Sequence, residues 1–202
     1  MKQNNNSTPM IIRCLKIVCY CIVSIFLSSC KNDEIEKQME MLYGSTISFP
    51  SEGMIKKDCS LYQEEVSDRC TKLVKYLEVF DCSDCQINQL SLFNNDTFNS
   101  GLSKRISIVY IVATPTGMNT YELYSKLCEK RIRGTVYLDT CNAFLQANPH
   151  VPEHTLFHTF VLDEKDKVVL IGDPFKNKKM ERLLLKVIEQ ESKHRETTET
   201  RL

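Results

Sequence analysis

Cys82 and Cys85, separated by two residues, are the pair in this 202-residue chain whose type and spacing most clearly indicate chemistry. Two thiols at this spacing can form, break and exchange a disulfide, because a thiolate attacks a disulfide sulfur. The apolar segment 73–80 reads as a buried strand and runs directly into the pair. Apolar residues at near-helical spacing follow, so a helix is expected over 85–93, capped by Asp81 or Ser83.

The same two cysteines could have a purely structural role. A disulfide between them could stiffen the start of the helix, or they could join Cys59 and Cys70 in a tetrathiolate zinc site. Cys59 and Cys70 do not form a second CxxC, and an oxidising compartment favours disulfides. We therefore predict no metal at these cysteines, and a structural disulfide stays open beside the redox pair.

Three histidines recur every four residues: His150, His154 and His158. This spacing suggests metal ligands on one helix face. Pro149 and Pro152 argue against a continuous helix, however, and no carboxylate completes a ligand set. No metal site is predicted here either.

The first thirty residues predict the compartment. Lys2, Arg13 and Lys16 precede the apolar run 17–27, which is too short to span a bilayer, and the pattern is that of a signal peptide. The sequence LSSC at 27–30 resembles the bacterial lipobox, which implies cleavage after residue 29 and a lipid on Cys30. Such a lipid would hold the protein on a membrane of the bacterial cell envelope, facing the periplasm or the cell surface.

The segment after Cys30 is a charged one. Residues 31–34 partly resemble the surface-export signal of lipoproteins from the Bacteroides group, and a solvated tether explains them equally well. Residues 35–43 could be a short helix or the rest of this tether. The expected organisation is a signal peptide over 1–29, a lipidated tether over 30–44, one domain over 45–191 and a polar tail over 192–202.

Charge and cysteine content narrow the function classes. The 26 basic and 26 acidic residues cancel, so nothing indicates a nucleic-acid partner. Six cysteines remain after the leader and Cys30: Cys59, Cys70, Cys82, Cys85, Cys128 and Cys141. Fifteen pairings are open to six cysteines. Besides the CxxC, bridges between Cys59 and Cys70 and between Cys128 and Cys141 are plausible.

The rest of the domain alternates strand-like and helix-like segments. Strands are expected over 45–49, 73–80, 106–113, 135–138, 156–162 and 168–171, the last two as a hairpin. Helices are expected over 85–93, 118–131, 142–147 and 177–191. This order predicts an α/β fold with a mixed central sheet and flanking helices.

Two features together carry a resemblance to a known family. The CxxC follows the first core strand, and residues 158–176, HTFVLDEKDKVVLIGDPFK, are similar to a hairpin of cytochrome-maturation and peroxiredoxin-like reductases. The segment 73–191 thus resembles the thioredoxin-like superfamily, especially exported thioredoxin-like lipoproteins of the Bacteroides group. The resemblance implies a three-layer thioredoxin-like fold, Cys82 as nucleophile at a helix N-terminus and Cys85 as resolving thiol, without an organic cofactor.

The sequence departs from the family pattern in three ways: acidic residues flank Cys82, no tryptophan precedes the CxxC because the chain has none, and the proline before the fourth strand is missing. Asp81 and Asp84 put negative charge beside Cys82, which should raise its pKa and slow its attack. The cis-proline that usually precedes the fourth strand is replaced by Phe157, so either the loop bulges to bring Pro152 back or the substrate platform is altered. A cationic His158 near Cys82 could offset the two aspartates.

The sequence leads to one functional prediction and one alternative. The prediction is a membrane-tethered thiol:disulfide oxidoreductase, of reductase or isomerase type. Its partners would be the thiols or disulfides of exported proteins and a further redox protein. The alternative is a thioredoxin-fold lipoprotein that serves as a redox-inactive binding or structural module.

Overall fold

The computed structural model describes residues 33–58, 71–79, 83–99, 105–114, 117–176 and 178–199. The chain divides into two compact units, residues 1–40 and 41–202. In the first unit, residues 33–40 are helical, and Gln38 Nε2 donates to Glu34 Oε1 one turn away at 3.2 Å. The expected signal peptide and Cys30 lie outside the described residues. Within those ranges, no helix has both the length and the apolar character needed to cross a bilayer.

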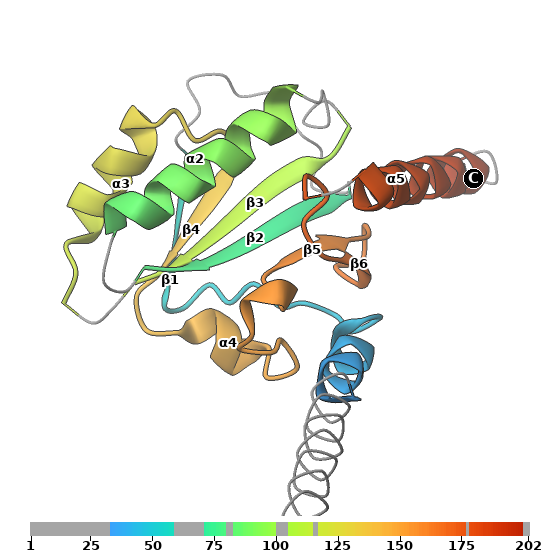
Figure 1. Ribbon diagram of the computed structural model, residues 1–202, viewed down its shortest axis with the longest axis horizontal. Helices are drawn as coiled ribbons and strands as arrows, with labels where there is room; N and C mark the ends of the chain where they lie inside the picture. The colour runs from blue at the N-terminus through green and yellow to red at the C-terminus, as the bar shows by residue number, and fades with distance from the viewer. Residues whose placement is uncertain are drawn as a thin grey trace, which may run out of the picture. The chain divides into compact units, whose positions relative to one another are not determined.

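The second unit is built on a six-stranded mixed sheet with the strand order β1-β4-β3-β2-β5-β6 (Figure 1). The strands are β1 (Met54–Asp58), β2 (Lys72–Glu78), β3 (Ser107–Ala113), β4 (Thr135–Asp139), β5 (Thr159–Leu162) and β6 (Val168–Ile171). The pairs β2–β3 and β3–β4 are parallel, and the other three pairs are antiparallel. Of the two central strands, β3 is apolar and buried from Ile108 to Val112, as expected where helices cover a sheet.

Helices lie on both faces of the sheet. They are α2 (Ser83–Asn99), α3 (Thr120–Glu129), α4 (Ala143–Ala147) and α5 (Lys178–Glu199), with a 3-10 turn, η2, at Thr155–Phe157. In Figure 1, α2 and α3 lie side by side over β2, β3 and β4. One apolar cluster joins this face of the sheet to these helices and to α5, and its members include Leu73, Tyr110, Val136, Leu90, Leu127 and Leu184.

The opposite face of the sheet packs against α4 through aromatic rings. Alternation along β2 sends Leu73 to the first face and Tyr76 to the second. The Tyr76 ring stacks on Phe144 of α4 with centroids 5.5 Å apart, and Phe49 stacks on Tyr137 at 5.7 Å. Both faces of β2 are therefore buried, which positions its carboxyl end firmly.

The predicted α/β fold with a mixed sheet and flanking helices is confirmed. Strand β2 with its following helix, the parallel strands β3 and β4 on one side and the antiparallel hairpin β5–β6 on the other make the arrangement thioredoxin-like. The expected strands over 73–80, 106–113, 135–138 and 168–171 and the expected helices over 118–131 and 142–147 occur within two residues of their predicted bounds, and the expected helix over 85–93 continues to Asn99.

Some expected elements differ in the structure. Residues 45–49 form no strand; Thr46 makes only an isolated bridge to Lys167. The expected strand over 156–162 begins only at Thr159, because η2 occupies its first residues. Helix α5 continues to Glu199, past the end expected at residue 191.

Strand β1 was not expected at all. Its sequence, MIKKD, has two adjacent lysines and no sustained alternation of apolar and polar residues. Such a sequence is compatible with an edge strand, and β1 pairs with β4 alone. Pairing with Val136, Tyr137 and Leu138 defines this strand rather than its own pattern.

Candidate functional site

The candidate site lies at the carboxyl ends of the three parallel strands. Glu78, Ala113 and Asp139 end β2, β3 and β4, and the register places Glu78 beside Ala113 and Ala113 beside Asp139. Helix α2 begins at Ser83, five residues after β2 ends. Open α/β sheets bind their ligands at this edge, so the CxxC segment lies where the fold favours a site.

Cys85 lies in the first turn of α2, where its side chain is exposed. It is disulfide-bonded. Among the described cysteines, Cys128 and Cys141 are free, so the partner of Cys85 lies outside the described residues. Cys82 also lies outside them, and its role as nucleophile stays a prediction.

The bridge between Cys128 and Cys141, one of the pairings that the sequence left open, does not form, because both thiols are free. The last turn of α3 leads into β4, since Ile132 N donates to Leu127 O at the end of the helix. Cys128 therefore lies near the start of β4, whereas Cys141 follows its end. A five-residue strand is roughly 17 Å long, and a disulfide needs Cα atoms within about 7 Å.

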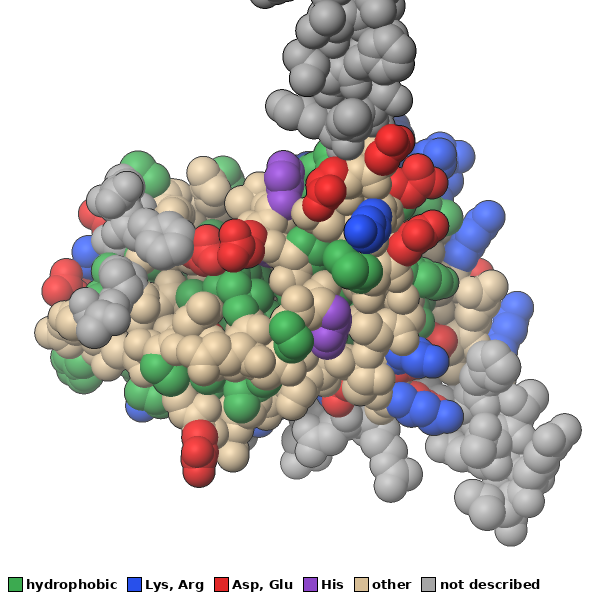
Figure 2. Space-filling model, turned by 90° about the horizontal axis from the view of Figure 1, so that it is seen from below, with side chains coloured by type: hydrophobic (Ala, Val, Ile, Leu, Met, Phe, Trp, Pro, Cys, Tyr) green, Lys and Arg blue, Asp and Glu red, His purple; other side chains and the backbone are tan. Residues whose placement is uncertain are grey.

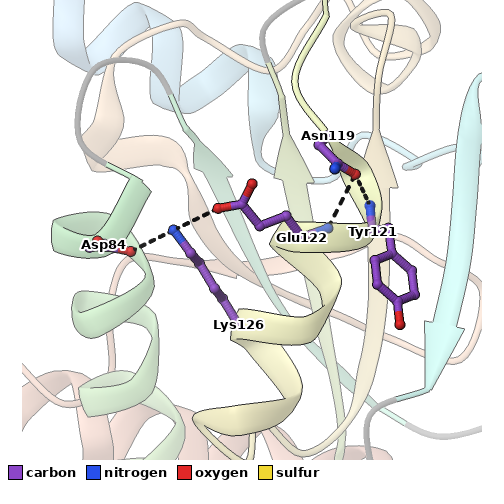
Figure 3. Close-up of polar contacts among 5 residues, drawn as sticks. All are labelled: Asp84, Asn119, Tyr121, Glu122 and Lys126. Carbon is purple, nitrogen blue, oxygen red and sulfur yellow. Dashed lines mark hydrogen bonds and ion pairs between the residues drawn. The ribbon is translucent and has the colours of Figure 1, made fainter.

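Asp84 lies between the two cysteines, directly before Cys85. It forms an ion pair with Lys126 of the neighbouring helix α3. Its Oδ1 lies 3.0 Å from Lys126 Nζ, and Lys126 Nζ lies 3.3 Å from Glu122 Oε1 (Figure 3). The hydrogen bonds to Asp84 and then to Glu122 raise the pKa of Lys126, so it is a cation at neutral pH. The negative charge expected to act on the CxxC is thus partly neutralised.

The start of α3 is fixed by its own cap. Asn119 Oδ1 accepts hydrogen bonds from Tyr121 N at 3.0 Å and from Glu122 N at 3.3 Å. This cap holds the turn that carries Glu122, and Lys126 follows one turn later on the same face (Figure 3). Helix α3 therefore presents Lys126 to α2 from a defined position.

A buried group lies behind the carboxyl end of β2. Tyr76 Oη donates to Glu78 Oε1 at 3.2 Å, and the ring of His158 lies edge-on to Tyr76 with centroids 4.7 Å apart. Burial, and next the charge of Glu78, raise the pKa of Tyr76, so its hydroxyl stays protonated. The Tyr76 hydroxyl and the His158 ring thus pack behind the strand that leads into the CxxC, with the Glu78 carboxylate hydrogen-bonded to Tyr76.

His158 does not have the cationic role expected from the sequence. Its side chain is buried, and its Nε2 lies 3.2 Å from Pro152 O, which can only accept, so Nε2 is the donor. Burial lowers the pKa of His158 despite this hydrogen bond, and Lys75 and His154 lower it further. His158 is neutral at pH 7, and it is Lys126 that brings a cation to Asp84.

The loop before β5 has an altered form. Phe157, at the position of the family's proline, is buried in η2, and all peptide bonds of the described segments are trans. Pro152 lies six residues before His158 and is tied to it through its carbonyl group. Leu156 is 51 % exposed beside this turn.

Asp139 is a polar residue that sequence reasoning missed. It is fully buried at the end of β4, where its carboxylate accepts from Cys141 N at 3.3 Å, Ala143 N at 2.8 Å and Phe144 N at 2.9 Å. It fixes the turn from β4 into α4. An aspartate between a strand and a short apolar helix is the signal that could have identified it.

The part of the chain that the structure describes holds no group of three metal-ligating side chains. His154 Nδ1 accepts from Leu156 N, and His158 bonds Pro152, so these two rings have other partners. Figure 2 shows the α4 end of the molecule, where histidine and hydrophobic side chains lie between acidic and basic ones.

The fold and the site define a thioredoxin-like domain with a disulfide-bonded cysteine at the start of the helix after its central strand. The sequence matches no protein-family profile and no curated protein. Its backbone is similar to the thioredoxin domain of a thiol-disulfide oxidoreductase from Bacteroides vulgatus, with 15% identity, a TM-score of 0.46 and coverage of 72% of this chain and 97% of that one.

Two other solved structures are comparably similar. A thioredoxin-like protein in its oxidised form has 12% identity, a TM-score of 0.47 and coverage of 76% of this chain and 97% of that one. A domain of a possible thiol-disulfide isomerase from Cytophaga hutchinsonii has 14% identity, a TM-score of 0.42 and coverage of 76% and 96%.

Proposed function

We propose that this protein is a membrane-anchored thiol:disulfide oxidoreductase, of reductase or isomerase type, that acts on exported proteins through Cys82 and Cys85. One observation carries the proposal. Cys85 is exposed and disulfide-bonded in the first turn of the helix that follows the central strand β2. Cys82, three residues earlier, is the partner that a CxxC supplies.

The reaction needs only the two thiols and the substrate disulfide. The Cys82 thiolate attacks one substrate sulfur, which forms a mixed disulfide and releases the other sulfur as a thiolate that takes up a proton. The Cys85 thiol loses its proton and attacks the Cys82 sulfur, which releases the second substrate thiol. Two electrons pass to the substrate, and the Cys82–Cys85 disulfide is reduced again by an external dithiol protein.

The surroundings of Cys85 support exchange at neutral pH. The positive end of the helix dipole at the start of α2 favours a thiolate over a thiol. Lys126 adds a cation next to Asp84, 3.0 Å from its carboxylate. The buried face of β2 and the Tyr76–Glu78 hydrogen bond hold the end of the strand that precedes the CxxC in place.

The membrane anchor is the second part of the proposal. The lipobox-like LSSC places a lipidated cysteine at residue 30, and the domain that begins near residue 45 would then face the periplasm or the cell exterior. Mass spectrometry of the protein from a bacterial membrane fraction tests this part. We expect diacylglycerol on Cys30, and an unmodified Cys30 would remove the anchor from the proposal.

The redox activity is tested with the full chain in detergent. After equilibration in mixtures of reduced and oxidised dithiothreitol, thiol alkylation and mass spectrometry measure the oxidised fraction of the CxxC. We expect a reversible transition and turnover of a small test disulfide. Cys82→Ser should lose turnover, Cys85→Ser should accumulate the mixed disulfide, and Cys141→Ser, which removes an exposed free thiol, should behave as the unchanged protein.

The alternative function predicts a different result. If the protein is a redox-inactive binding or structural module, the CxxC disulfide resists reduction in the native protein. Turnover would also be absent, or it would persist in Cys82→Ser through other thiols. Either result would exclude the oxidoreductase and leave the module.

A further inference from the structure

Lys126 is a cation whose ammonium group contacts the first turn of α2 at Asp84. It comes from α3, 42 residues further along the chain, and its Nζ lies 3.0 Å from Asp84 Oδ1. Figure 3 shows the lysine side chain extending from α3 toward Asp84, with Glu122 on its other side. The contact therefore joins two helices at the point where the CxxC enters α2.

The charges in this group do not cancel. Two carboxylates, Asp84 and Glu122, share one ammonium group, so the group carries one net negative charge with Lys126 and two without it. Negative charge beside a helix N-terminus opposes formation of a thiolate there. Lys126 consequently decides how much of the Asp84 charge the neighbouring cysteines experience.

We propose that Lys126 is a positioning residue of the CxxC, which holds Asp84 against α3 and neutralises its charge so that the thiolate at residue 82 can form. This inference rests on the proposed function and adds the group that adjusts its reactivity. Lys126 does not touch the substrate. It acts through Asp84, a residue that lies inside the motif.

Contacts within α3 orient the Lys126 side chain. Asn119 caps α3 through the backbone N–H groups of Tyr121 and Glu122. Glu122 then holds the ammonium group from within its own helix, at the i,i+4 spacing that favours such pairs. The lysine is thus oriented by α3 before it reaches Asp84, which lowers the conformational entropy lost on pairing.

The test compares Lys126→Met with Lys130→Met in the full chain. Lys130 is an exposed lysine at the end of the same helix and serves as the matched control for loss of one positive charge. We expect Lys126→Met to slow the reaction of Cys82 with a small disulfide at pH 7 about threefold. The CxxC should also become more reducing by about threefold in its equilibrium constant, or roughly 15 mV. Lys130→Met should change neither value.

Two further variants separate electrostatics from general structure. Lys126→Arg keeps the charge and should restore both the rate and the equilibrium constant. In the background of Asp84→Asn, replacement of Lys126 should have less than half of its effect on the rate, because the lysine has lost the carboxylate through which it acts. A purely structural role of Lys126 would change stability but would not follow this pattern.

The outcomes distinguish this inference from the proposed function. If the unchanged protein does not exchange with dithiols at all, the proposed function fails and the inference fails with it. If the unchanged protein exchanges normally while Lys126→Met equals Lys130→Met in rate and equilibrium, the inference alone is overturned. An equal effect of Lys126→Met with and without Asp84 would also overturn it.

Discussion

Asp139 and Asp84, two aspartates near the carboxyl edge of the sheet, differ in burial and in the kind of partner they have. Asp139 is fully buried, and its carboxylate accepts hydrogen bonds from backbone N–H groups within five residues of it. Asp84 is 73 % exposed, and it pairs with Lys126, 42 residues away in the sequence. The first geometry holds a turn in place. The second places an ion pair beside the CxxC and contributes little to stability, because the pair is exposed. We therefore expect Asp139 to matter for folding and Asp84 for the reactivity of the CxxC.

The largest effect on stability is expected at Asp139. Asp139→Ala leaves three backbone N–H groups beside an empty space and should lower the free energy of unfolding by about 3 kcal/mol. Urea unfolding followed by circular dichroism measures this, since the chain has no tryptophan. Asp163→Ala is the control, because Asp163 accepts from Lys165 N and Lys167 N in a less buried turn and should cost about 1 kcal/mol. Equal losses would contradict the comparison.

Asn148 should come next. It is fully buried, and it joins α4 to the segment before β1 by accepting from Ser48 N at 2.7 Å and donating to Ser48 O at 2.8 Å. Asn148→Ala removes both bonds and should cost about 2 kcal/mol in the same measurement. A loss below about 0.5 kcal/mol would mean that water replaces the side chain. Exposed Asn142 offers a control on the same helix, where replacement by Gly at its φ of 59° should be nearly neutral.

The buried histidine predicts a pH dependence of stability. The pKa of His158 is lowered in the folded protein, so between that value and about 6.5 the unfolded chain binds more protons. The free energy of unfolding should therefore fall as the pH is lowered from 7.5 to 5.5, by less than about 1.4 kcal/mol per pH unit. His150, whose pKa burial also lowers, contributes in the same direction. His158→Gln should flatten the curve, and an unchanged slope would exclude His158 as its source.

The smallest effect on stability is expected at Asp84. Asp84→Asn removes an exposed ion pair and should change the free energy of unfolding by less than about 0.5 kcal/mol. The same substitution removes negative charge beside the CxxC, so the attack of Cys82 at pH 7 should become about two- to threefold faster. Stopped-flow measurement with a small disulfide gives the rate. A large loss of stability without a change in rate would reverse the roles assigned to the two aspartates.

The central part of the fold could be predicted because its pattern is local. Residues 73–80 and 106–113 are mostly branched and aromatic apolar residues over a strand's length, which favours buried strands in a covered sheet. The apolar stripe of α5 and the turn residues between β5 and β6 are likewise readable in the sequence. Strand β1 was missed because an edge strand with two lysines is defined by its neighbour.

The site was predictable only in part, because the decisive contacts are long-range. The sequence predicts that the charge of Asp84 affects the reactivity of the CxxC. Nothing in the sequence indicates that Asp84 pairs with Lys126. His158 has the right type for a cation near the site, but its burial, which is a tertiary property, makes it neutral. The pairing of Cys128 with Cys141 looked plausible by count alone, and the length of β4 excludes it.

The segment that leads into the sheet has a mechanical consequence. Gly44 N bonds Val168 O, Val168 N bonds Ser45 O, and Ile47 N bonds Asp166 O, one after another along the chain. Tension pulling on the chain from its amino-terminal side would load these bonds in order of sequence rather than all together. They would therefore break at lower force than the hydrogen bonds between paired strands. A pull from the amino-terminal side would release residues 44–47 first, before the force reached the strands of the sheet.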